Sequence, residues 1–310
     1  MSKKIFKQTR KIYHNQHKIF FKNNDLFKRF YEYAVNPSNY CLDKKFFKGA
    51  TVLDAGCGNT GYFTKAMIDL GCEKVICLDL GKKWIGELKK GLKFKKVDIS
   101  KVIFKSGSIT NIPLKTNSVD FVACNGVLYH LPSLSAVSKA VKEFNRVVKI
   151  GGNVFAYFGV EKPGIIEKYI FPAIRTAYIN EKEFKNFVDY GDLNLLQKNL
   201  KNLIDVFHKN DKSVTFKNLK NFVKLFNNET IMFIQDCLQT PVYQLNKLNK
   251  KFVFNIFKKI GAKNIRVPKD YYFARSDVRK FLTPFHVTKK KNLLSRVLYG
   301  EHLKFTFKKG

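Results

Sequence analysis

Three glycines and one aspartate follow a short apolar run near residue 50. Gly56, Gly58 and Gly61 have the spacing G-x-G-x-x-G, and Asp54 stands two residues before the first of them. Glycines let a backbone approach a ligand closely, and the free N–H groups at the start of a following helix favour a negative group. Taken alone, the segment fits either a tight strand-to-helix turn or a cofactor site.

A second acidic residue, Asp79, ends the next apolar run, eighteen residues after Gly61. A carboxylate there can accept hydrogen bonds from two ribose hydroxyls, or it can cap the following helix. The first interpretation indicates a cofactor with a nucleoside, such as NAD or S-adenosylmethionine (SAM). Asp54 favours SAM, because a carboxylate beside a pyrophosphate is repelled, whereas one beside an ammonium and a sulfonium is stabilised.

These residues are expected where strands end in an α/β domain. Strands are predicted over 51–54, 74–79, 102–105, 119–124, 153–160, 264–267 and 271–275. Helices are predicted over 62–70, 82–90, 133–148 and 252–260. Strands that alternate with helices are typical of βαβ units. The predicted fold is therefore a Rossmann-like, seven-stranded, mostly parallel sheet flanked by helices, with a helical cap or insertion.

Four ordered blocks resemble the class I SAM-dependent methyltransferases, especially the branch that methylates small molecules such as quinone precursors. The blocks read VLDAGCGNTG, VICLDL, SGSITNIPLKTNSVDFVACNGVLYHL and RVVKIGGNVFAYFG, and the likeness resumes at FVFNIFKKIGAKNIRV. Their joint match is more specific than the glycine pattern alone. The resemblance implies SAM as cofactor and in-line transfer of its methyl group to an O, N or C nucleophile.

The resemblance also implies a set of cofactor-binding residues. These are Asp54, Gly56, Cys57, Gly58, Gly61, Asp79, Leu80, Ser108, Ile109, Asn125 and Gly126. In the family, the first acid and glycines hold the methionine part of SAM and the second acid holds the ribose. Ser108 replaces an acid that usually contacts the adenine amino group, although Ile109 can still offer its backbone N–H. One extra residue precedes Gly61, where the family more often has G-C-G-x-G.

Candidates for catalysis and acceptor binding are fewer. Tyr129 and His130 follow the fourth predicted strand, where His130 could act as a general base or simply be packed. Tyr243, in the segment QTPVYQLN, resembles a P-x-Y segment near the substrate pocket of some of these enzymes. The segment NPSNY (36–40) resembles the N-P-P-Y signature of enzymes that methylate base amino groups. It precedes the first strand, so an ordinary proline turn is expected.

The amino-acid composition indicates function less clearly than the motifs do. The net charge of +34 points to nucleic acid or an anionic membrane surface. However, all but eight of the 58 basic residues are Lys, which is typical of an AT-rich genome. No apolar run approaches the length of about 18 residues that spans a membrane, and the N-terminus lacks the features of a secretory signal. The six cysteines show no zinc-ligand spacing, so we expect no metal and a reduced, cytoplasmic protein.

The expected organisation has five parts. They are an N-terminal helical lid (1–48), a SAM-binding core (49–162), a helical insertion over the substrate (163–250), the last helix and strands of the core (251–278) and a basic C-terminal tail (279–310). The expected acceptor is a small molecule, a lipid or a glycan. The alternatives are an RNA methyltransferase that uses the Lys-rich surface, a non-catalytic SAM-binding protein and an NAD(P)-dependent oxidoreductase.

Overall fold

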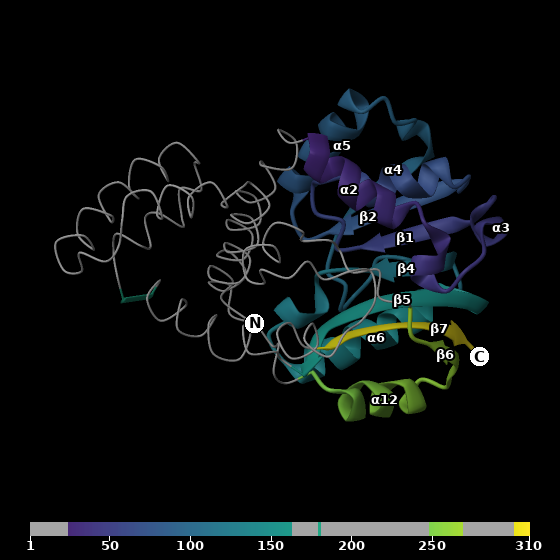
Figure 1. The fold of residues 1–310 in the computed structure, drawn as a ribbon, viewed down its shortest axis with the longest axis vertical. Coiled ribbons are helices and arrows are strands. Elements are labelled where there is room, and N and C mark those ends of the chain that lie inside the picture. Colours follow the sequence, from purple (N-terminus) through teal and green to yellow (C-terminus); the bar gives the residue numbers. More distant parts are fainter. Residues whose placement is uncertain (1–23, 163–178, 181–247, 269–300) are drawn as a thin grey trace, which may run out of the picture. The chain divides into compact units, whose positions relative to one another are not determined.

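The computed structural model describes residues 24–162, 179–180, 248–268 and 301–310. Apart from residues 179–180, they belong to one of the two compact units into which the chain divides. They form a seven-stranded sheet in the order β3-β2-β1-β4-β5-β7-β6 (Figure 1). The strands are β1 (Thr51–Ala55), β2 (Lys74–Asp79), β3 (Val102–Ser106), β4 (Val119–Cys124), β5 (Val148–Lys162), β6 (Ala262–Arg266) and β7 (Glu301–Lys309). Strands β1 to β5 pair in parallel, and β7 runs antiparallel to β5 and β6.

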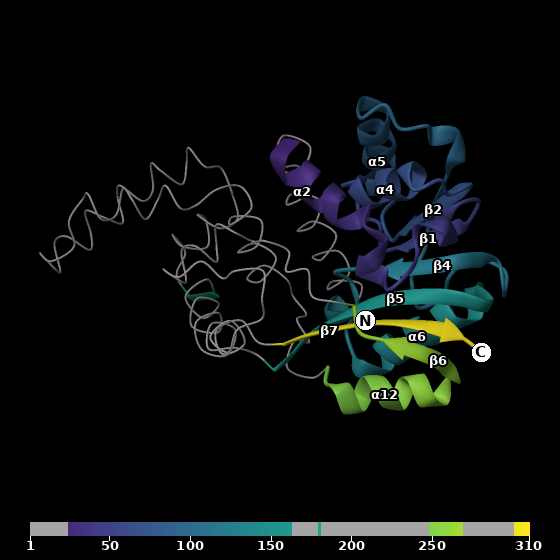
Figure 2. The same ribbon diagram turned by 45° about the vertical axis from the view of Figure 1, so that its right-hand side comes forward.

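Helices cover both faces of this sheet, as the mostly parallel arrangement requires. The helices are α2 (Asn24–Ala34), α3 (Lys44–Phe47), α4 (Tyr62–Asp69), α5 (Lys82–Phe94), α6 (Leu134–Val147) and α12 (Lys250–Lys259). Short 3₁₀ turns are η1 (Pro37–Tyr40), η2 (Ile99–Lys101) and η3 (Leu128–His130). Helices α4 and α5 lie on one face, and α6 and α12 lie on the other (Figure 1, Figure 2). The predicted fold class is confirmed, while the predicted cap (163–250) lies almost entirely outside the described residues.

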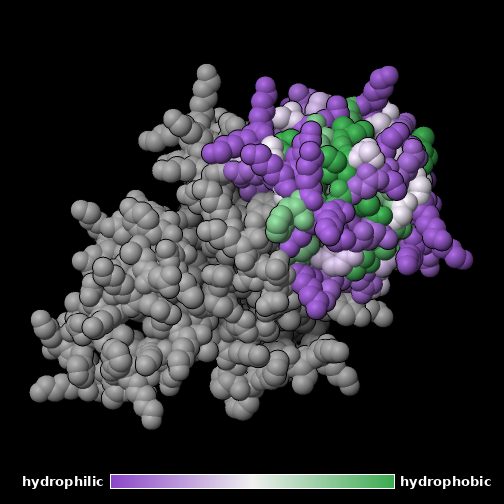
Figure 3. Space-filling view, turned by 90° about the horizontal axis from the view of Figure 1, so that it is seen from above, coloured by the Kyte–Doolittle hydropathy of each residue, from purple (hydrophilic) through white to green (hydrophobic). Residues whose placement is uncertain are grey.

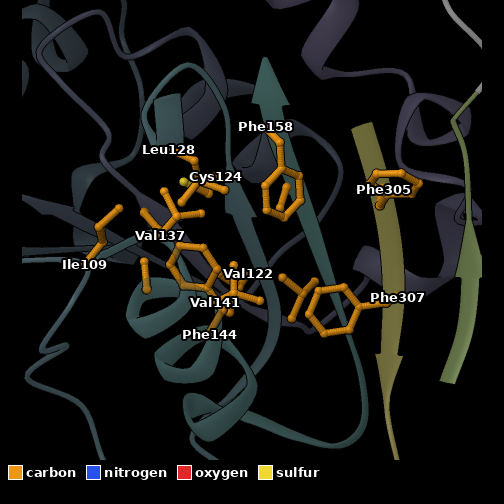
Figure 4. Close-up of a cluster of buried hydrophobic side chains, with 14 of the residues drawn as sticks. Ile109, Val122, Cys124, Leu128, Val137, Val141, Phe144, Phe158, Phe305 and Phe307 are labelled. Carbon is orange, nitrogen blue, oxygen red and sulfur yellow. The ribbon is translucent and has the colours of Figure 1, made fainter. Parts of the chain in front are cut away.

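The spacing of apolar residues in α6 explains why this helix packs against the sheet. Val137, Val141 and Phe144 recur at helical spacing and are fully buried. They lie together with Val122 of β4 and Phe307 of β7 (Figure 4). Burying a large aliphatic or aromatic side chain contributes about 1.5–3 kcal/mol, so this stripe fixes α6 against the sheet.

The opposite face contains the segment NPSNY. Asn36 caps η1, since its Oδ1 accepts a hydrogen bond from the backbone N–H of Ser38 at 3.2 Å. Tyr40, which ends this turn, is buried against the rings of Phe47, Phe121 and Phe155. The proline turn is therefore confirmed, and it belongs to the core of the domain.

The C-terminal residues depart from the sequence prediction. The sequence predicts a basic tail over 279–310, but residues 301–309 form β7 between β5 and β6. Leu303, Phe305 and Phe307 are buried on the side of α12. Lys304, Lys308 and Lys309 gave this strand the composition of a tail, although Lys304 is also buried. The strand predicted over 271–275 lies outside the described residues.

The largest differences in element boundaries are in β5 and α5. Strand β5 begins at Val148, whereas the sequence predicts a helix to 148 and a strand from 153. Val148 already has an extended backbone, with φ −70° and ψ 141°, and pairs with Val119 of β4. Helix α5 runs four residues further than predicted, to Phe94.

Candidate functional site

The predicted cofactor residues meet at one edge of the sheet. Asp54 pairs in register with Cys77 of β2 on one side and with Ala123 of β4 on the other. Asp79 ends β2, and Asn125 directly follows β4. The carboxyl ends of neighbouring parallel strands form the usual ligand crevice of an open α/β sheet. The structure thus brings these three side chains to one crevice edge.

The loop between β1 and α4 needs its glycines. Gly56, Gly58 and Gly61 have φ values of +90°, +58° and +71°, which side chains disfavour. A Cβ atom on Gly56 would lie 2.5 Å from Cγ2 of Val127, in the segment after β4. The loop is held against β2, because the N–H of Gly56 donates to the carbonyl of Leu78 at 2.8 Å. The first glycine therefore lets β1 and the segment after β4 approach closely.

Asp79 is anchored to this loop and does not cap α5. Its Oδ2 accepts a hydrogen bond from the N–H of Gly58 at 2.8 Å, and its Oδ1 accepts one from Leu80 at 2.6 Å. The N-cap of α5 is Gly81. Each carboxylate oxygen has a second lone pair, so a fixed and almost buried carboxylate could still accept from a ligand.

Asp54 has a different environment. Its half-buried carboxylate accepts no hydrogen bond and forms no ion pair within the described part of the chain. Burial raises its pKa to about 8, with a smaller contribution from the negative charge of Asp79. A positively charged group beside Asp54 would lower this pKa and stabilise the ionised carboxylate, whereas a pyrophosphate would raise the pKa further. This arrangement fits the ammonium and sulfonium of SAM.

Tyr62 is a member of the site that sequence reasoning missed. Its hydroxyl is hydrogen-bonded to the side chain of Asn125, while burial and the charge of Asp54 raise its pKa. Its ring lies 5.2 Å from that of Phe30 in α2. Tyr62 therefore joins the start of α4 to the segment after β4, and it links the N-terminal region to the site. Its position directly after Gly61 is the sequence feature that could have identified Tyr62 as a site residue.

The extra residue in the glycine loop also has a structural role. The side chain of Asn59 is fully buried, and its Nδ2 donates to Oε2 of Glu87 in α5 at 2.9 Å. Its Oδ1 has no partner in the described part of the chain. The longer loop is therefore accommodated by a contact with the neighbouring helix.

Hydrogen bonds hold the backbone of the predicted adenine-binding segment, residues 107–109. The N–H of Gly107 donates to the carbonyl of Asp79 at 2.8 Å, and Ile109 is buried. The Ser108 hydroxyl accepts from the N–H of Thr110 at 3.1 Å, so it closes its own turn. Ser108 thus stabilises the backbone of this segment, whereas the family acid would contact the adenine.

An ion pair on α6, which sequence analysis did not predict, also anchors this segment. Glu143 and Arg146 are joined by a hydrogen bond of 2.8 Å. Oε2 of Glu143 accepts from the N–H of Ile112 at 2.7 Å. The Arg146 guanidinium donates to the carbonyls of Ile112 and Leu114 at 2.9 and 2.8 Å. The pair therefore fixes the loop that carries Ser108 and Ile109.

The catalytic candidates lie next to Gly126. A Cβ atom on Gly126 would lie 3.6 Å from the Tyr129 hydroxyl. The buried Tyr129 ring lies 4.1 Å from the ring of His130 and 5.6 Å from that of Tyr157, between ring centroids. Tyr157, at the far end of β5, was not singled out from the sequence. The roles of Tyr129 and His130 stay predictions.

Other predicted features are outside the site. Tyr243 lies outside the described residues. Within those residues, no group of His, Cys, Asp and Glu side chains could hold a metal ion. None of the described helices is long and apolar enough to span a membrane.

Comparison with known proteins agrees with this geometry. Residues 53–156 match the family model described as a methyltransferase domain, and they contain β1, the glycine loop, Asp79 and β4. Residues 53–156 are thus similar to a methyltransferase domain.

Individual similar proteins cover parts of the chain. The chain is 34% identical to a tRNA U34 carboxymethyltransferase of Campylobacter hominis over 155 residues, which are 45% of this chain and 52% of that protein. It thus spans about half the length of this curated relative. A solved structure of a putative SAM-dependent methyltransferase from Listeria monocytogenes is 23% identical, with 37% of this chain and 48% of that one covered and a TM-score of 0.30. A putative methyltransferase from Bacillus halodurans is 15% identical, with 84% and 90% covered and a TM-score of 0.40.

Proposed function

We propose that the chain transfers a methyl group from SAM to a nucleophilic atom of its acceptor by in-line displacement. The observation that carries this proposal is the pair of carboxylates at the ends of β1 and β2. Asp54 has no donor within the described part of the chain, so a cationic group would stabilise its ionised form, whereas a pyrophosphate would oppose it. This supports SAM over a nicotinamide dinucleotide.

The chain's own residues would bind and orient the two reactants. Asp79 would hold the ribose hydroxyls, Gly56 and Gly58 would admit the methionine part, and Ile109 would line the adenine. Bound SAM supplies an electrophilic methyl group on a positively charged sulfur. The surrounding side chains would align the acceptor and exclude water, which is what a displacement with a good leaving group requires.

We further propose RNA as the acceptor. The Campylobacter hominis relative acts on tRNA by its name, and it is 34% identical to this chain over 155 residues. The net charge of +34 is of the sign that attracts the RNA backbone. That relative's name gives carboxymethyl as the group it transfers, so a carboxylated form of SAM belongs among the donors to be tested.

A small molecule, lipid or glycan is the second candidate acceptor. It is favoured by the resemblance to methyltransferases of quinone precursors and by the aromatic group of Tyr129, His130 and Tyr157 beside Gly126. Aromatic side chains at the crevice edge suit a small planar acceptor. In this case His130 would take the proton from the attacking atom.

Calorimetry with SAM and S-adenosylhomocysteine, followed by transfer assays, tests both parts of the proposal. We expect micromolar binding to the wild type that is lost in Asp79→Ala, with circular dichroism as the control for folding. Radiolabelled methyl groups should then enter the RNA fraction of a cell extract. Label in the small-molecule or lipid fraction would favour the second acceptor. Binding without transfer to any fraction would favour a non-catalytic protein, and no binding by folded wild type would overturn the function.

A further inference from the structure

The solvent-facing side of α5 carries a row of lysines. Lys82, Lys83, Lys89, Lys90 and Lys93 are all exposed. Positions 82 and 89, like 83 and 90, are seven residues apart, which is two helical turns, so they share one side of the helix. None of the five forms an ion pair within the described part of the chain. The row therefore presents uncompensated positive charge.

The acidic residues near this row are already engaged. Glu87, the acidic residue of α5, accepts the hydrogen bond from Asn59 of the glycine loop. Asp98 accepts from both the N–H and the hydroxyl of Ser100, and these bonds lower its pKa. Beyond the helix, exposed Lys96 and Lys101 extend the positive charge.

An aromatic side chain stands at the end of the row. Phe94, the last residue of α5, is 76% exposed, and Ile103 on the edge strand β3 is 39% exposed. Figure 3 looks onto the molecule from the side of α5 and shows projecting hydrophilic side chains around hydrophobic surface. Lysines beside an exposed aromatic ring are the combination that binds single-stranded nucleic acid, with phosphates on the charges and a base on the ring.

We infer that this side of α5, here called the α5 face (Lys82, Lys83, Lys89, Lys90, Lys93 and Phe94), binds the backbone and one base of RNA. The inference rests on the proposed RNA acceptor and assigns it a surface. The face begins three residues after Asp79, at the crevice edge, and Glu87 ties it to the glycine loop. RNA along α5 would therefore lie beside the cofactor site.

Two observations favour RNA over a membrane and over composition alone. The apolar side of α5, with Trp84, Leu88 and Leu92, is buried against the domain, which leaves Phe94 as the large apolar side chain for a bilayer. Lysine content alone does not single out α5, because α12 (Lys250–Lys259) exposes the four lysines Lys250, Lys251, Lys258 and Lys259. The side of α5 differs because the helix begins three residues after Asp79 and its phenylalanine is the more exposed, at 76% for Phe94 against 45% for Phe254.

Helix α12 supplies a matched control on the opposite side of the sheet, because it also has an exposed lysine pair and an exposed phenylalanine. We would compare the full-length double variants K89E/K90E on α5 and K258E/K259E on α12, which change the net charge equally. Fluorescence anisotropy with a labelled single-stranded RNA of mixed sequence gives affinity against salt. Calorimetry with SAM on the same samples reports separately on the cofactor site.

We expect K89E/K90E to weaken RNA binding at least tenfold and K258E/K259E to weaken it less than twofold. If each lysine contacts one phosphate, the slope of the logarithm of the RNA-binding constant against the logarithm of salt concentration should become shallower by about 1.4 in K89E/K90E. Phe94→Ala should weaken binding about fivefold or more without changing the slope, since stacking carries no counterion release. Phe254→Ala is its control.

Equal weakening in the α5 and α12 variants would overturn the inference in favour of general charge. Unchanged RNA affinity in K89E/K90E would also overturn the inference. If this variant then lost binding to phosphatidylserine vesicles, the α5 face would be identified as a membrane surface. Unchanged SAM binding in K89E/K90E is part of the expected result. Failure of the wild type to bind SAM would instead overturn the proposed function and leave the RNA comparison standing.

Discussion

The carboxylate of Asp79 accepts a hydrogen bond from the backbone N–H of Gly58 at 2.8 Å. The end of β2 thus determines the path of the glycine loop that follows β1. Asp79 is also the residue that would bind the ribose. Because it holds the loop in shape before any ligand arrives, less conformational entropy is lost on binding.

Asp79→Asn should therefore affect both the fold and the cofactor site. The amide keeps one acceptor oxygen but loses the charge, and a hydrogen bond to a charged group contributes about 1.5–3 kcal/mol. We expect a lower free energy of unfolding in urea and a SAM affinity reduced at least tenfold. Asp69→Asn on the exposed side of α4 is a control that should leave SAM affinity unchanged.

Gly56→Ala should destabilise the loop for two separable reasons. The added Cβ would lie 2.5 Å from Val127, and a φ of +90° costs a non-glycine residue about 1–3 kcal/mol. The double variant Gly56→Ala/Val127→Ala removes the clash and keeps the backbone strain. Thermal unfolding of the two variants should show partial recovery in the double variant. Full recovery would mean that the backbone conformation costs nothing.

The stability of the ligand-free protein should fall as the pH rises from about 4 to about 8. Asp54 has a pKa of about 8 in the folded protein and about 4 when unfolded. Between these values the folded state holds a proton that the unfolded state lacks, so the slope of stability against pH is negative. Urea unfolding from pH 5 to 9 should reveal this trend in the wild type. Asp54→Asn, which cannot ionise, should flatten it, and an equal slope in both proteins would contradict the assignment.

Arg146→Lys should weaken cofactor binding although Arg146 lies on a helix away from the crevice edge. Lysine keeps the charge but cannot donate to Glu143, Ile112 and Leu114 together. The loop with Ser108 and Ile109 would lose its anchor, so we expect the KM for SAM to rise severalfold with kcat little changed. Lys142→Ala, one turn earlier on the exposed side, should leave both constants unchanged. A fall in kcat alone would contradict a role in positioning the loop.

The sequence was most informative where one residue type is physically required. The glycines near 56–61 and the acids at 54 and 79 lie together as their spacing predicted, because few other residues suit a left-handed turn between a strand and a helix. Helix α6 was equally predictable, since Val137, Val141 and Phe144 recur at helical spacing.

Features that depend on distant partners could not be predicted in this way. Glu143 and Arg146 look like an ordinary surface pair three residues apart on a helix, and their contacts with the backbone at 112 and 114 exist only in the folded chain. Asn59 gives no hint in the sequence that it is buried against Glu87. Strand β7 was missed because its lysines suggested a solvated tail, whereas residues 303–307 are all buried.

The place of β7 in the sheet also bears on how the protein is made. Within the described sheet, β6 has no strand partner except β7, and β5 needs β7 to complete its second side. A ribosome adds about 5–20 residues each second, so β6 waits on the nascent chain until residues 301–309 have been synthesised and released from the exit tunnel. The half of the sheet with Asp54 and Asp79 can assemble before residues 301–309 are synthesised, whereas the other half can close only after them.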